Sequence, residues 1–505
     1  MNRRSTLQVE SCRKTIESVE STCNVQPATC NRFYADWRDR RSHVLALHEK
    51  PGLPSERLLQ AVWHHQRLWR DRLRMADGRP IRVLHPGFWN RGAGPDFENA
   101  VLQIEDERPR SGDVEIDLHS NCWRAHGHDR NPAFRGVVLH VVWEAEDNTT
   151  APTLPLKSFL DATMLELASW LSTDAAESFP ENLLGRCASA VGQLSDEKLS
   201  ELLRQAALAR LQRKAGDLEA RARQAGWEQS LWEGLFRALG YQPNVWPMLR
   251  LAELRPQFQG RPAADAPLWQ ARLLGLSGLL PAEFKNAPAD SAAYLRRAWD
   301  VWWRERDELG EFILPRPLWR LNGLRPANHP LRRLALAAHW WADEKLPARL
   351  EKWFAESVPD EDLEESLLAP LQAPSDEFWS WHWTFRTPRL AQPQPLLGAT
   401  RVTDLAINVL LPWFWVRARA GRNTALQAEA ERRYFAWPAA QDNAVLRLAR
   451  QRLLGRDSAR GFRTAASQQG LLQIVRDFCD HADALCADCA FPDLVSGYAA
   501  VGGRY

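Results

Sequence analysis

The chain has 505 residues, which is long for one compact core, so two or three domains are expected. Hydrophobic residues make up 45% and charged residues 25%, a balance that excludes a wholly disordered or collagen-like chain. The 65 basic and 63 acidic residues leave a net charge of +2, so bulk charge does not draw the protein to nucleic acid or to an anionic membrane. Any site for a polyanion must therefore be local.

The termini and the apolar segments indicate where the protein is expected to reside. Residues 1–40 are polar and lack periodicity, which predicts a loose N-terminal extension. No apolar core follows its two arginines, so no secretory signal is expected. The longest apolar stretch, residues 405–416, is shorter than the ~18 residues that a membrane helix needs. We therefore expect a cytoplasmic protein without a membrane partner.

Residues 41–156 are predicted to form a small α/β domain. Ser55 can cap a helix from residue 56 to about residue 75. The domain ends with a polar segment that contains a helical turn, followed by a continuous apolar run. Such a run is typical of a strand buried on both faces. The strand-like runs cover residues 81–84, 97–104, 113–118 and 137–143.

Residues 157–505 are predicted to form an α-helical region. Ser195 can cap its first long amphipathic run, and no repeat of fixed period follows. The expected fold class is therefore α+β or α/β: a small domain in the order helix, three strands, helix, strand, and then a large all-α region.

The densest group of carboxylates falls on the predicted strands. Asp96 immediately precedes the second strand, and alternation along the third places Asp113, Glu115 and Asp117 on one face. Such carboxylates repel one another unless they are solvated or bound to a metal ion. We predict Asp96, Glu115 and Asp113 as metal ligands; the alternative is that Asp96 is a turn residue beside an exposed acidic strand face.

The order of elements resembles the PD-(D/E)xK nuclease fold. Pro95 and Asp96 match the first motif element, Glu115 the second, and Glu56 the glutamate that some members use on the first helix. The resemblance implies that the two motif carboxylates hold Mg²⁺ or Mn²⁺, which activates a water for attack on a phosphodiester. It also implies nucleic acid as a partner.

The position of the motif lysine holds Asp117 instead. In a variant site Asp117 would be an extra catalytic ligand, with His119 or His126 near the attacking water; otherwise the fold has lost its activity. His126 and His128 are also candidate metal ligands, although histidines so placed in a loop are usually exposed polar residues. His140 lies inside the apolar strand and is predicted to be buried and hydrogen-bonded.

A second metal site is predicted near the C-terminus. Cys479, Cys486 and Cys489 have a spacing that suits Zn²⁺ or an iron–sulfur cluster, and it resembles the first three positions of the cluster loop in endonuclease III-type DNA glycosylases. Cys187, Cys122 or His481 would supply the missing fourth ligand. Otherwise these cysteines are buried small residues.

Three arginines surround a predicted helix start at which Asn328 is the expected cap. Arg325, Arg332 and Arg333 would there contact phosphate, in addition to the structural role of the segment.

Several segments together resemble a bacterial family catalogued as a domain of unknown function, number 2851. The similarity covers nearly everything after about residue 40 and implies no established activity. The segments are GPDFENA at 94–100, GDVEI at 112–116, HGHD at 126–129, VVLHVVWE at 137–144, RPANHP at 325–330 and SQQGLL at 467–472.

Three functions are compatible with these observations. The first is a metal-dependent nuclease acting on DNA or RNA. The second is a catalytically degenerate nuclease fold that acts as a nucleic-acid-binding protein or scaffold. The third is an unrelated hydrolase that uses the histidine cluster.

Overall fold

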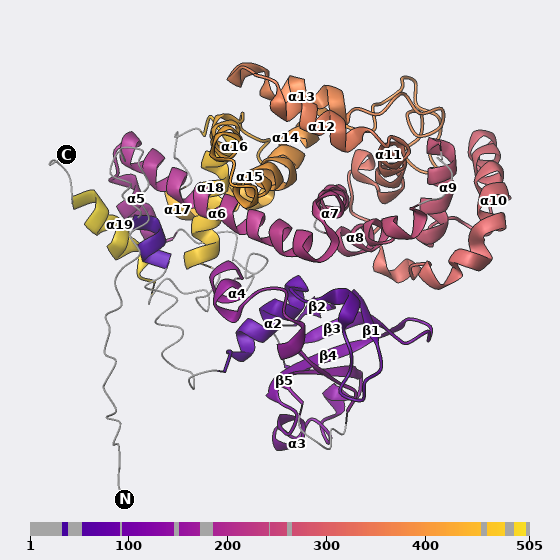
Figure 1. Cartoon of the computed structure of the whole chain (residues 1–505), viewed down its shortest axis with the longest axis horizontal. Helices are drawn as coiled ribbons and strands as arrows, with labels where there is room; N and C mark the ends of the chain where they lie inside the picture. The colour runs from indigo at the N-terminus through magenta and orange to yellow at the C-terminus, as the bar shows by residue number, and fades with distance from the viewer. Residues whose placement is uncertain are drawn as a thin grey trace, which may run out of the picture.

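The computed structural model describes residues 33–38, 53–90, 93–145, 151–171, 185–241, 243–259, 265–455, 462–479 and 489–500. It confirms the α+β architecture: a mixed β-sheet between residues 81 and 155 precedes a large, mostly helical region (Figure 1). Within the described ranges, no helix is long and apolar enough to cross a membrane.

The sheet has the strand order β1-β3-β4-β5-β6, with β2 paired to β3. Strands β1, β3 and β4 are antiparallel, whereas β5 and β6 run parallel to β4. The strands are β1 (Ile81–His85), β2 (Phe88–Trp89), β3 (Phe97–Ile104), β4 (Arg110–His119), β5 (Val137–Glu144) and β6 (Thr153–Pro155).

Helix α2 (Glu56–His65) packs against β4 and is shorter than the sequence predicts. The Ser55 hydroxyl accepts a hydrogen bond from the Leu58 N–H at 3.1 Å, as expected for the cap. Gln66 adopts a left-handed conformation with φ of 50°, and its N–H bonds to carbonyls of the last turn. This closure ends the helix after His65, although apolar residues continue beyond it.

The helical region contains helices of six to thirty residues. It follows β6, whereas the short helix α3 (Cys122–Ala125) lies between β4 and β5. A π-helical turn, Ala406–Leu410, joins α14 to α15 and interrupts the continuous helix that the sequence predicts over residues 403–416. The helices are α4 (Met164–Trp170), α5 (Cys187–Gly192), α6 (Asp196–Ala225), α7 (Trp227–Gly240), α8 (Val245–Glu253), α9 (Ala266–Leu276), α10 (Ala289–Leu309), α11 (Pro330–Ala342), α12 (Leu346–Ala355), α13 (Leu363–Leu371), α14 (Ala399–Leu405), α15 (Leu411–Ala420), α16 (Thr424–Ala436), α17 (Ala444–Leu454), α18 (Ala465–Phe478) and α19 (Phe491–Ala500).

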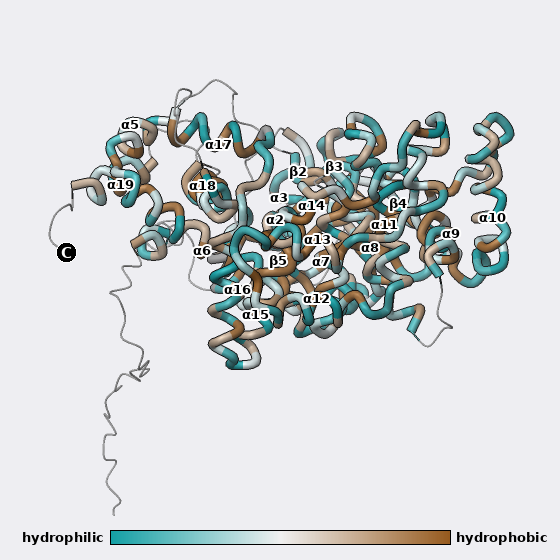
Figure 2. Tube along the Cα trace, turned by 90° about the horizontal axis from the view of Figure 1, so that it is seen from above, coloured by the Kyte–Doolittle hydropathy of each residue, from teal (hydrophilic) through white to brown (hydrophobic). Residues whose placement is uncertain are grey.

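Three apolar clusters form the interior. One lies around the sheet and α2, a large one lies among helices α6 to α16, and a third joins α5, α17, α18 and α19 to the first part of α6. Figure 2 shows this third group at one end of the molecule and α10 at the other. The helical region therefore has two cores that the long helix α6 connects.

Part of the predicted N-terminal extension belongs to the third cluster. Residues 33–38 are helical, and Phe33, Tyr34 and Trp37 are buried. The Tyr34 hydroxyl donates to an Asp477 carboxylate oxygen at 2.8 Å. Aromatic side chains therefore anchor residues 33–38, whereas residues 1–32, 39 and 40 of the predicted extension lie outside the described residues.

Candidate metal centre

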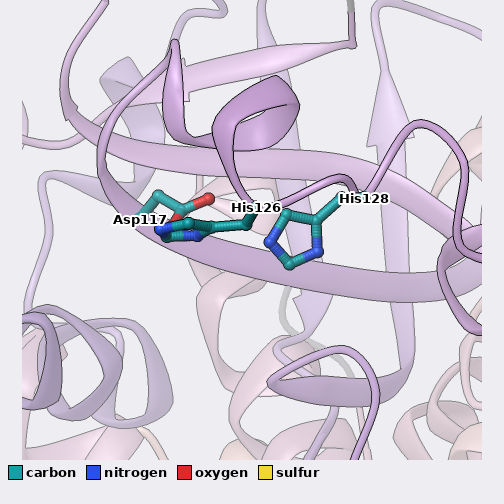
Figure 3. Close-up of side chains that lie close together, drawn as sticks. All are labelled: Asp117, His126 and His128. Atoms are coloured by element: carbon teal, nitrogen blue, oxygen red, sulfur yellow. The ribbon is translucent and has the colours of Figure 1, made fainter.

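Strand β4 and the loop after α3 bring three metal-binding side chains together. Asp117 lies near the end of β4, and His126 and His128 follow α3. Gly127 between the histidines has φ of 73°, a conformation that glycine adopts without strain. The resulting turn directs both histidines toward the strand (Figure 3).

One ligand atom from each of Asp117, His126 and His128 lies within 4.8 Å of the others. The nearest His126 contact joins its Nδ1 to Asp117 Oδ1 at 3.3 Å. No other group of three or more histidine, cysteine or carboxylate side chains comes this close together among the described residues. The arrangement can hold a metal ion.

His140 of β5 fixes the orientation of the Asp117 carboxylate. Its Nε2 lies 2.9 Å from Asp117 Oδ2, and both side chains are almost completely buried. His140 is thus buried and hydrogen-bonded, as the sequence predicts. A histidine that holds a ligating carboxylate is a common second layer around metal ions.

His128 is enclosed by aromatic rings but has unsatisfied ring nitrogens. Trp123 stacks on it with ring centroids 5.4 Å apart, and Phe134 approaches to 4.0 Å. Both Nδ1 and Nε2 are buried without a hydrogen-bond partner in the described part of the chain. The nearest carboxylate oxygen, Glu115 Oε1, lies 3.6 Å from Nε2. Because an unpaired buried polar group costs about 1–3 kcal/mol, a bound cation would satisfy this imidazole.

The two motif carboxylates are linked across β3 and β4. Asp96 Oδ2 accepts a hydrogen bond from the Ile116 N–H at 3.0 Å, and Glu115 Oε2 accepts one from the Asp96 N–H at 3.1 Å. Burial raises the pKa of Asp96 to about 7. Burial and then the charge of Asp96 raise the pKa of Glu115 to about 8. The pair therefore favours neutralisation by a proton or a cation.

Glu56 joins this group through Gln60. The Gln60 amide donates to Asp96 Oδ1 at 2.8 Å and to Glu56 Oε1 at 3.2 Å. Burial and then the charge of Asp117 raise the pKa of Glu56. Gln60 was not singled out by the sequence, because one buried amide in a helix carries no distinctive pattern.

Two other predicted residues lie outside the three-ligand group. The Asp113 carboxylate accepts a hydrogen bond from the Asn99 N–H at 3.1 Å, which directs it toward β3. His119 ends β4 opposite Glu144 of β5. The structure thus gathers Glu56, Asp96 and Glu115 near Asp117 and the two histidines, but not Asp113.

The predicted cysteine site is not assembled within the described residues. Cys187, Cys479 and Cys489 line one small cavity, but their sulfurs are not all within 4.8 Å of one another. Cys486 lies outside the described residues. The three thiols instead pack in or against the apolar cluster around α18. This agrees with the alternative prediction that these cysteines are buried small residues.

The three predicted phosphate-binding arginines have different surroundings. Arg332 and Arg333 are buried; Arg332 donates to carbonyls such as Pro395 O at 2.9 Å, and Arg333 to Leu396 O at 2.9 Å. Arg325 is exposed. The cap of α11 is His329 rather than the expected Asn328, because the His329 Nδ1 accepts the Leu331 N–H at 3.3 Å.

The comparisons with known proteins identify a family without assigning an activity. Neither the curated proteins nor the solved structures gave a match. The family model described as Protein of unknown function (DUF2851) matches residues 56–443, which include the sheet, the candidate metal centre and most of the helical region. The chain therefore belongs to the DUF2851 family.

Proposed function

We propose that the sheet domain is a metal-dependent hydrolase that cleaves phosphodiester bonds of DNA or RNA. The observation that carries the proposal is His128, whose ring nitrogens are buried without hydrogen bonds and which offers a ligand atom within 4.8 Å of those of Asp117 and His126. Asp96, directly before β3, and Glu115 of β4 lie beside this centre, and this position and their resemblance to the PD-(D/E)xK arrangement support a phosphodiester as the substrate.

The donor set favours a particular class of cation. Two imidazoles and a carboxylate suit Zn²⁺ or Mn²⁺ better than Mg²⁺, which prefers oxygen ligands and retains its waters. The resemblance to the PD-(D/E)xK fold implies Mg²⁺ or Mn²⁺ at the motif carboxylates instead. We therefore expect Zn²⁺ or Mn²⁺ to bind at Asp117, His126 and His128.

The chain's own residues would position the reacting groups. A bound cation supplies charge that polarises the phosphoryl group and lowers the pKa of water. The Glu115 carboxylate lies beside His128, where it would orient the attacking water, and Gln60 holds Asp96 and Glu56 in place. In the hydrolysis a water oxygen forms a bond to phosphorus, the ester P–O bond breaks, and the leaving oxygen takes up a proton.

A degenerate nuclease fold is the second candidate. It is favoured by the Asp96 carboxylate, of which one oxygen accepts from Gln60 and the other from the Ile116 N–H. Through these two hydrogen bonds Asp96 links α2 and β4 to the start of β3, which is a structural role. The absence of the motif lysine from position 117 points the same way.

Metal binding is tested by titrating the chelator-treated protein with Zn²⁺, Mn²⁺ and Mg²⁺ in a calorimeter. We expect stoichiometric Zn²⁺ or Mn²⁺ binding by the wild type and at least tenfold weaker binding by Asp117→Asn and His128→Gln, since each removes one ligand. Asp129→Asn is the matched control, because it removes a partly exposed carboxylate next to His128. Equal binding by all variants would refute this metal centre.

Cleavage is tested on labelled single- and double-stranded DNA and RNA with the cation that binds. The wild type and Asp129→Asn should both cleave at least one substrate. Asp117→Asn and Glu115→Gln should cleave none. Stoichiometric metal without cleavage would refute the nuclease and leave the degenerate fold. Cleavage that survives Asp117→Asn would place the activity elsewhere.

A further inference from the structure

A large basic cleft lies in the helical region, separate from the candidate metal centre. It has a volume of about 950 Å³ and is lined by residues of α6, α7, α11, α14 and α17 and by the segments around residues 325–328 and 394–398. Seven basic and three acidic side chains line it. The overall charge of the chain is nearly zero, so this excess of positive charge is local.

The acidic side chains of the cleft already have partners. Asp217 pairs with Arg67, and Asp404 with Arg401. Asp442 Oδ2 lies 2.9 Å from an Arg450 nitrogen. The carboxylates of the cleft are therefore engaged: Asp217 also lies near Arg213, and Asp404 and Asp442 have their own arginine partners.

Three arginines of the cleft lack such partners. The side chains of Arg237, Arg325 and Arg447 form no hydrogen bond or ion pair with the described residues, and all three are exposed to solvent in the cleft. The protein around the Arg237 guanidinium removes part of its hydration and so lowers its pKa, although arginine stays protonated at neutral pH. A guanidinium that has lost part of its hydration and has no ion-pair partner is stabilised by hydrogen bonds to a bound anion.

We propose that this cleft binds the phosphate groups of a nucleotide or of a nucleic-acid strand. Planar guanidinium groups match the geometry of phosphate oxygens and form paired hydrogen bonds with them. The volume is at the upper end of that of small-molecule sites, about 300–1,000 Å³, so it accommodates more than one phosphate group. Arg325, which the sequence suggests for phosphate contact, lines this cleft; Arg333 also borders it but is buried and donates to the Leu396 carbonyl, and Arg332 does not line it.

The inference stands independently of the proposed hydrolysis, because no residue of the metal centre lines the cleft. Binding is therefore measured in EDTA, where failure of the metal centre has no effect. The probes are a fluorescein-labelled 20-nucleotide single strand, followed by anisotropy, and unlabelled ATP as a competitor or a direct ligand.

The test variant combines Arg237→Gln, Arg325→Gln and Arg447→Gln. The matched control combines Arg296→Gln, Arg297→Gln and Arg304→Gln, which remove the same charge from exposed arginines of α10 outside the cleft. We expect the test variant to bind at least tenfold more weakly at 100 mM salt and the control to bind like the wild type. The slope of log K against log salt should flatten by about two for the single strand, because each phosphate that a removed arginine neutralised accounts for ~0.7.

The outcomes decide both the site and the source of the phosphate. If the protein binds the single strand, the ligand of the cleft is a nucleic acid. If it binds ATP but not the single strand, the cleft is a mononucleotide site. Equal weakening by the test and control variants would overturn the proposal in favour of non-specific charge. Absence of binding of both probes by folded wild type would also overturn it. Should the triple variant not fold, single Arg325→Gln and Arg447→Gln carry the same comparison.

Discussion

Glu233 of α7 joins the helical region to Arg70, in the segment between α2 and the sheet, and its removal should destabilise the protein. Its carboxylate is 3% exposed. It accepts hydrogen bonds from Arg221 of α6 at 2.8 and 2.9 Å, from Gln229 at 3.0 Å, and from Arg70, which follows α2, at 3.1 Å. Arg70 also lies 2.7 Å from Glu253. Glu233→Gln keeps the shape but leaves two largely buried guanidiniums short of negative charge.

Breaking a buried ion pair by removing one partner costs about 3–5 kcal/mol. At roughly 2 °C per kcal/mol for a large domain, the melting temperature of Glu233→Gln should fall by about 6–10 °C. The control is Glu228→Gln on the same helix, whose side chain is 57% exposed and pairs with Arg255. This variant should change stability by at most ~1 kcal/mol. Equal melting temperatures of the two variants by calorimetry would refute the reasoning.

Three other predictions concern acid sensitivity, packing and metal affinity. Burial lowers the pKa of His85 to about 4, so as the pH falls the unfolded chain binds a proton at this histidine before the folded chain does. The free energy of unfolding should therefore fall by ~3 kcal/mol between about pH 6.5 and pH 4. Urea titrations at these two pH values should show that His85→Asn removes this loss. Gly470→Ala should cost ~1–3 kcal/mol in thermal melts, because its Cβ would lie 2.3 Å from the Leu203 carbonyl oxygen, whereas Gly497→Ala meets nothing within 4 Å. His140→Phe should weaken Zn²⁺ binding by about 10–100-fold in calorimetry, and unchanged affinity would exclude it as a support of the ligand carboxylate.

The sequence predicts the sheet better than the surroundings of the site. Alternation and apolar runs predicted the four longest strands, because strand burial leaves a local pattern. The end of α2 was missed, since the left-handed turn at Gln66 lacks the usual glycine. The strands β2 and β6 were also missed, because they are only two and three residues long.

The candidate site was only partly predictable for a related reason. Asp117 and its neighbours could be found because they crowd one short segment, and the motif around Gly127 drew attention to both histidines. The contact of His140 with Asp117 depends on the parallel pairing of β4 and β5, which local patterns do not reveal. Likewise Arg237 and Arg447 line one cleft but lie on helices distant in the sequence.

The helical segment at residues 33–38 has a consequence for how the chain is made. Phe33 stacks on Tyr498 with ring centroids 4.3 Å apart, and Tyr34 bonds to Asp477, a residue 443 positions later. At the usual ~5–20 residues per second, a ribosome needs roughly 20–90 s to synthesise the partners that bury these aromatic rings. Until then the rings are exposed on the growing chain, and the bundle of α5, α17, α18 and α19 is completed last. Chains interrupted before α18 would carry this apolar segment uncovered, a natural target for chaperones.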